Sequence, residues 1–94
     1  MDIIIKKEND FIEARVSGEF TVADILTAKE KLAELINENA DIKLDISNVG
    51  EFDSSALQLL SAFSKYAGEK GINVKIVSNS SKTELFLKTY GMEI

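Results

Sequence analysis

Three short runs of the chain alternate apolar with polar residues, and this period of two constrains the fold more than any other feature. It predicts β-strands over residues 11–17, 41–46 and 72–77. A parallel sheet covered on both faces would have uninterrupted apolar strands, so the alternation predicts that helices cover mainly one face. The apolar positions are Ile12, Ala14, Val16, Ile42, Leu44, Ile46, Ile72, Val74 and Ile76.

An opening β-hairpin precedes these strands. Residues 3–6 form another short β-type run, and the polar residues 7–10 between it and the strand from Phe11 are typical of a hairpin turn. Proline is absent from the whole chain, and we find no repeat, linker or low-complexity tract.

The segments between the strands have a helical period. The first helix is expected from Thr21 as its N-cap, with Asp24 as the acid of a capping box. The second is expected from Ser54 to Lys70, where Gly71 ends it. The predicted buried stripes are Val22, Ile25, Leu26, Leu32, Ala33 and Ile36 in the first, and Ala56, Leu59, Leu60, Phe63 and Ala67, with Tyr66 at the edge, in the second.

A last helix is expected over residues 81–89, burying Leu85 and Phe86 and stopping near Gly91. Helices that alternate with strands after an opening hairpin indicate an α/β fold with right-handed crossovers. We therefore expect one domain over residues 1–94, with a mixed sheet of about four strands and helices packed mainly on one face.

Composition excludes several classes of function. The chain of 94 residues contains no cysteine and no histidine, which removes disulfides, thiolate metal sites and the commonest general base. A net charge of −5 disfavours duplex nucleic acid and anionic lipid as partners. No apolar run is long enough for a membrane span and no signal peptide is visible, so a cytoplasmic protein without direct membrane insertion is expected.

Asp53, Ser54 and Ser55 stand immediately before the apolar stripe of the second helix. A helix N-cap needs only one short polar side chain, so capping explains one of these three residues. A helix N-terminus also tolerates a phosphate, because its free N–H groups carry partial positive charge. The pattern thus leaves two alternatives open, a simple cap or a phosphorylated serine that Glu51 and Asp53 would repel.

Leu57 falls off the apolar stripe, near Ser54, Ser61 and Ser64, and is expected to be an exposed partner contact or an isolated surface leucine. Enzymatic activity is disfavoured, because neither serine has an evident base and no phosphate loop occurs. Asp45 is interpreted as a polar residue at a strand end. Glu51 and Asp53 lack a third metal ligand, so neither a cofactor nor a metal is expected.

Four segments resemble, in order, those of the STAS domain, the family of the bacterial anti-sigma factor antagonists. The segment Phe52-Asp53-Ser54-Ser55-Ala56-Leu57 is similar to the family's I-D-S-S-G-L and is the most specific. The others are residues 16–20, like the strand that ends in G-E-L/F, residues 42–49, like L-D-L-S-x-V, and residues 85–92, like the closing helix. Ala56 departs from the family's usual glycine, and Thr21 stands where many antagonists have aspartate.

The resemblance implies a partner-switching module. In the antagonists, a partner that is both serine kinase and anti-sigma factor phosphorylates the second serine of D-S-S, and a phosphatase resets the cycle. This implies Ser55 as the phosphoacceptor, with Ser54 as second choice. The implied partner contacts are Thr21, Asp53, Ser54, Leu57, Gln58 and Ser61.

An alternative function follows from other members of the same family. Related single-domain proteins are constitutive accessory subunits of lipid ABC transporters or belong to stress and chemotaxis complexes. In that case the same helix face would be a permanent interface. The sequence leaves the oligomeric state open and favours a monomer, because the alternate face of the sheet is polar.

Overall fold

The computed structural model describes residues 1–77, which form four strands, two α-helices and one 3₁₀ turn. The helix expected over residues 81–89, with Leu85, Phe86 and Gly91, lies outside the described residues. The elements in order are β1 (Asp2–Lys7), β2 (Phe11–Phe20), the 3₁₀ turn η1 (Val22–Asp24), α1 (Ile25–Ile36), β3 (Asp41–Phe52), α2 (Ser54–Glu69) and β4 (Val74–Val77).

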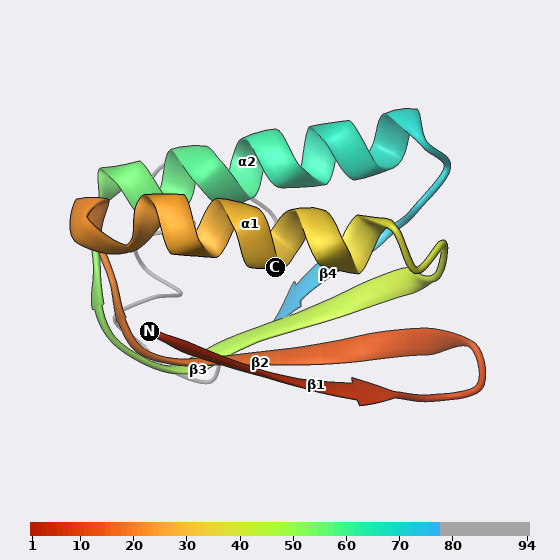
Figure 1. The fold of residues 1–94 in the computed structure, drawn as a ribbon, viewed down its shortest axis with the longest axis horizontal. Coiled ribbons are helices and arrows are strands. Elements are labelled where there is room, and N and C mark those ends of the chain that lie inside the picture. The colour runs from red at the N-terminus through yellow and green to blue at the C-terminus, as the bar shows by residue number, and fades with distance from the viewer. Residues whose placement is uncertain (78–94) are drawn as a thin grey trace.

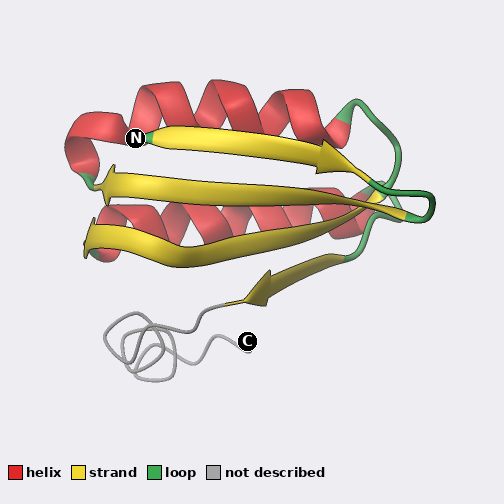
Figure 2. Ribbon diagram, turned by 90° about the horizontal axis from the view of Figure 1, so that it is seen from below, coloured by secondary structure: helices red, strands yellow, loops and turns green. Residues whose placement is uncertain are grey.

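The four strands form one mixed sheet in the order β1-β2-β3-β4. β1 and β2 pair antiparallel, which confirms the opening hairpin, whereas β2–β3 and β3–β4 pair parallel. Figures 1 and 2 show α1 and α2 side by side on the same face of this sheet. The α/β architecture with helices on one face is therefore confirmed.

The core lies between the sheet and the two helices. The alternating apolar residues of β2 and β3, such as Ala14 and Leu44, are fully buried, as the period of two predicts. β3 continues past the predicted end at Ile46 to Phe52, and its pairing with β2 shifts register after Arg15. The extension brings Phe52 against Phe20, with ring centroids 5.8 Å apart in an edge-to-face arrangement.

Within residues 1–77, the face of the sheet opposite α1 and α2 is mostly polar. Arg15 of β2 pairs with Glu13 at 3.3 Å and with Asp45 of β3 at 3.9 Å. Burial by itself would raise the pKa of Asp45, but hydrogen bonds from Ser47 and the charges of Arg15 and Lys43 together hold this pKa below its ordinary value. Asp45 lies within β3 and not at its end, so its predicted position was wrong, although its role as a polar residue of the sheet fits the structure.

The buried stripe predicted for α1 is wrong in half of its members. Leu32 and Ile36 are buried and Ile25 is half-buried, but Val22 and Leu26 are 69% and 73% exposed. Ala33 is exposed too, whereas Ala28 and Leu35, which the stripe left out, are buried. α1 therefore turns a different face to the sheet, and part of its apolar surface faces outward.

The end of α2 follows a Schellman motif, as Gly71 predicts. Gly71 has a φ of +77°, in the left-handed region that glycine adopts without strain. Its N–H bonds the carbonyl of Gly68 at 3.0 Å, and the N–H of Ile72 bonds the carbonyl of Ala67 at 2.9 Å. Ile72 is buried, so the turn directs the chain back into the core before β4.

Candidate functional site

Asp53 determines the geometry where β3 passes into α2. It is the N-cap of α2, and its Oδ1 accepts a hydrogen bond from the N–H of Ala56 at 3.1 Å. Its Oδ2 accepts a second one from the N–H of Val22 at 3.0 Å, across 31 residues of sequence. One carboxylate thus holds the starts of α2 and η1 together, and the cap is the aspartate and neither serine.

Thr21 and Asp24 fix the turn on the other side of this junction. An Asp24 carboxylate oxygen accepts hydrogen bonds from the backbone N–H of Thr21 at 3.2 Å and from its hydroxyl at 3.3 Å. The carbonyl of Thr21 in turn accepts the N–H of Asp24 at 2.9 Å. Thr21 therefore begins η1, as expected of a cap, and the turn presents the exposed side chain of Val22 next to Asp53.

The two serines differ in their surroundings. Ser54 is exposed, whereas Ser55 is half-buried and lines a groove between α1 and α2. Neighbouring residues of a helix point about 100° apart, which directs Ser55 toward α1 and Ser54 away from it. Since Asp53 provides the cap, the hydroxyl of Ser55 is not required to begin the helix.

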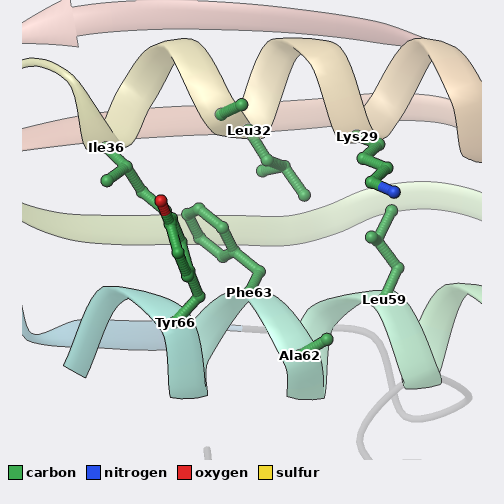
Figure 3. A pocket seen from close by; sticks show the side chains of 8 residues that line it. Lys29, Leu32, Ile36, Leu59, Ala62, Phe63 and Tyr66 are labelled. Carbon is green, nitrogen blue, oxygen red and sulfur yellow. The ribbon is translucent and has the colours of Figure 1, made fainter. Parts of the chain in front are cut away.

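The α1–α2 groove has two adjoining sections that share Lys29, Leu59 and Ala62. The wider section, of about 670 Å³, also includes Val22, Ile25, Leu26, Ser55 and Gln58. The narrower section, of about 350 Å³, continues with Leu32, Ala33, Ile36, Phe63 and Tyr66. In Figure 3, Lys29 of α1 points toward Leu59 of α2, and Phe63 and Tyr66 extend from α2 toward α1.

Exposed apolar side chains border this groove. Val22 and Leu26 lie at its wider section, and Tyr66, at 51% exposed, lies at the other end with Lys70 over its ring. Exposed apolar side chains along a groove of this kind are typical of a protein-interaction site. Lys29 is the one charged residue that lines either section within residues 1–77, so the groove is apolar with a single cation.

The structure brings some of the predicted contact residues to the groove and its adjoining turn, and places the others elsewhere. Ser55 and Gln58 line the wider section of the groove. Asp53 accepts a hydrogen bond from Val22 beside it, and Thr21 begins the adjoining turn. Ser61 is exposed but lines neither section of the groove.

The structure contradicts the prediction that Leu57 is exposed. It is only 6% exposed and belongs to the core, so the expectation of an exposed partner contact was wrong. Whether Leu57 is buried depends on how α2 is rotated about its axis against the sheet. In the structure this rotation directs Leu57 into the core and Leu59 toward the groove. Val22 and Leu26, which the sequence pattern assigned to the core, are the surface residues that it missed.

The described residues contain no group of three His, Cys, Asp or Glu side chains that could hold a metal ion. Within residues 1–77, no helix has the length and apolar character required to cross a membrane. The arrangement around Ser55 combines a hydroxyl, an apolar groove and one lysine, which suits binding of another molecule.

The chain belongs to the STAS domain family. Residues 8–94 match the family model described as "Mlab, STAS domain". A comparison with curated proteins gave no match.

Solved structures with the same fold include anti-sigma factor antagonists. One from Mycobacterium paratuberculosis superposes with a TM-score of 0.87 at 16% identity, covering 96% of this chain and 77% of that one. The phosphorylated form of the Bacillus cell fate determinant SpoIIAA gives a TM-score of 0.71 at 16% identity, covering 97% and 85%. A serine-to-glutamate variant of RsbS from Moorella thermoacetica gives 0.76 at 20% identity, covering 100% and 81%. At these identities the likeness shows a common fold.

Proposed function

We propose that this protein is a partner-switching module that docks a serine-kinase-type protein at the α1–α2 groove and is regulated by phosphorylation of Ser55. One observation carries the proposal. Ser55 lines the same groove section as Val22 and Leu26, which are 69% and 73% exposed. A modification there would lie inside the apolar surface that a partner covers.

A phosphate on Ser55 would weaken docking for electrostatic reasons. Phosphoserine carries a charge of about −1.5 to −2, and burying it in an apolar contact is costly unless it is paired. The carboxylate of Asp53 lies within the same first turn and would repel it. The unphosphorylated form therefore binds, and the phosphorylated form is released.

The modification itself requires groups that the partner supplies. The γ-phosphoryl of ATP is transferred to Oγ of Ser55, the bond to the β-phosphate oxygen breaks and ADP leaves, while a base of the partner takes the hydroxyl proton. Asp53 is poorly suited as that base, because both of its oxygens already accept hydrogen bonds. A phosphatase then hydrolyses the phosphoserine with water and restores the hydroxyl. Among the structures with this fold are a phosphorylated form of SpoIIAA and a serine-to-glutamate variant of RsbS, and both are compatible with phosphorylation in this chain.

A second candidate is a constitutive accessory subunit, for example of a lipid ABC transporter. Exposed apolar residues at the groove, Val22 and Leu26, are what a fixed interface of this kind would use. In that role the groove is a fixed interface, and binding survives Ser55→Asp. Partner switching instead requires that Ser55→Asp binds poorly.

Intact-mass measurement after incubation with ATP and a lysate of the host organism tests the proposal. We expect the protein to gain one phosphate that the Ser55→Ala variant does not gain, while Ser54→Ala still gains it. Phosphate uptake by Ser55→Ala would refute the assigned site. No uptake, under conditions that modify an established antagonist, would favour the constitutive subunit.

A further inference from the structure

Lys29 is the charged residue that lines the wider section of the α1–α2 groove together with Ser55. It extends from α1 toward Leu59 of α2, which follows Ser55 by one helical turn on the same face (Figure 3). The ion pairs within residues 1–77 engage the N-terminus, Lys6, Lys7 and Arg15, and none of them uses Lys29. Lys29 is therefore an exposed cation beside an apolar groove without a carboxylate partner in the described part of the chain.

Carboxylates lie near Ser55 on the side away from the groove, and one of them, Asp24, is paired with the N-terminal ammonium at 3.7 Å. Asp53 precedes α2, Glu51 is exposed at the end of β3, and Asp24 closes the η1 turn. A phosphate on Ser55 is repelled from the junction by the carboxylates of Asp53 and Glu51, which form no ion pair within residues 1–77. On the groove side it meets only apolar side chains, Gln58 and Lys29. Among the residues that line the groove within residues 1–77, Lys29 alone offers the phosphate a positive charge.

We infer that Lys29 is the positioning residue for phosphorylated Ser55, and that the pair bridges α1 and α2 across the groove. The bridge covers Leu59 and separates Val22 and Leu26 from the rest of the apolar surface. Phosphorylation then closes the docking surface of the protein itself, in addition to repelling the partner. The inference deepens the proposed function and depends on it only for the choice of Ser55.

The experiment installs phosphoserine at position 55 during translation, so that neither a kinase nor a partner is required. The second pKa of the phosphate is followed by ³¹P NMR in the parent sequence and in Lys29→Gln. An ordinary phosphoserine has a second pKa of about 6. Because a neighbouring cation favours the dianion, we expect this pKa to be about 0.3–0.7 unit lower with Lys29 than with glutamine.

Two controls separate a specific pair from a general effect of charge. Lys31→Gln removes the same charge from α1 at a residue that lines neither section of the groove, and should shift the pKa much less. Phosphoserine at position 54, which also lies outside the groove, should not respond to Lys29→Gln. Lys29 and Lys31 variants change a surface side chain, and circular dichroism checks that each remains folded.

Equal pKa values for phosphoserine 55 with and without Lys29, or equal shifts from Lys29→Gln and Lys31→Gln, would overturn the inference. Either result leaves the proposed phosphorylation of Ser55 intact, because that proposal is tested by mass in the presence of ATP. Conversely, failure to find a kinase leaves the pairing measurement valid. The two proposals therefore fail independently.

Discussion

At the scale of single residues, Asp53 has the clearest structural role in the candidate site. Its two carboxylate oxygens serve two backbone N–H groups that are far apart in sequence, those of Val22 and Ala56. The sequence identified Asp53 as one of three possible caps, but it could not identify the bond to Val22. That bond depends on β2 and β3 ending at the same edge of the sheet.

Replacing Asp53 should therefore cost more than losing an ordinary cap. We expect Asp53→Ala to lower the free energy of unfolding by about 1–3 kcal/mol, because the N-cap bond and the bond to Val22 are both lost. Urea denaturation measures the change. The matched control is Glu51→Ala, an exposed acid two residues away, which should change stability by less than about 0.5 kcal/mol. Equal effects of the two substitutions would contradict this role for Asp53.

Leu57 shows why the sequence could not predict the burial of every side chain in α2. Ala56, Leu57 and Leu60 are all buried, so the buried face of α2 is wider than the stripe read from the period of 3.6. A leucine at the border of such a stripe is placed by the packing partner opposite it. No sequence pattern within α2 contains that information.

At the scale of elements, two glycines show how local backbone preference determines where α2 ends. Gly68 lies in the last turn of α2, and Gly71 lies just past its end. Gly71 has a positive φ and closes a Schellman motif. The sequence predicted that this glycine ends the helix, from its position after an apolar stripe. Gly68 lies inside the helix, and a Cβ there would meet nothing within 4 Å. The two glycines are three residues apart but have opposite conformational requirements.

Alanine substitutions at these two glycines should therefore shift stability in opposite directions. Gly71→Ala is expected to destabilise the protein by about 1–2 kcal/mol, because a Cβ is strained at positive φ. Gly68→Ala is expected to stabilise it by about 0.5–1 kcal/mol through higher helix propensity. Thermal unfolding of both variants shows whether each substitution raises or lowers Tm. A lower Tm for Gly68→Ala would disprove the predicted stabilisation.

At the scale of the whole molecule, the groove arises only from the packing of α1 beside α2 on one face of the sheet (Figure 1). Each helix supplies part of its lining, and the widest section lies where η1 and α1 adjoin the first turns of α2. The exposed residues Val22 and Leu26 are candidate contact residues because they line this groove. In the sequence they are indistinguishable from core residues.

The double variant Val22→Ser/Leu26→Ser tests whether this surface docks the partner. Because both side chains are exposed, we expect stability to change by less than about 1 kcal/mol. Phosphate uptake at Ser55 in the lysate assay should fall at least about tenfold, since the kinase loses apolar contact area. Ile4→Ser, at an exposed isoleucine of β1, is the control and should not slow uptake. Unchanged uptake by the double variant would refute docking at this surface.

The sequence by itself determined which segments become strands and helices, the hairpin, the covered face of the sheet and the end of α2, because these depend on local period and backbone preference. It also indicated the STAS family through the segment around Asp53-Ser54-Ser55. Only the tertiary structure decided that Leu57 is buried, that Val22 and Leu26 are exposed, and that Ser55 and Lys29 line the same groove. These properties depend on how each helix is rotated against the sheet and its neighbour, which is determined by contacts between residues distant in sequence.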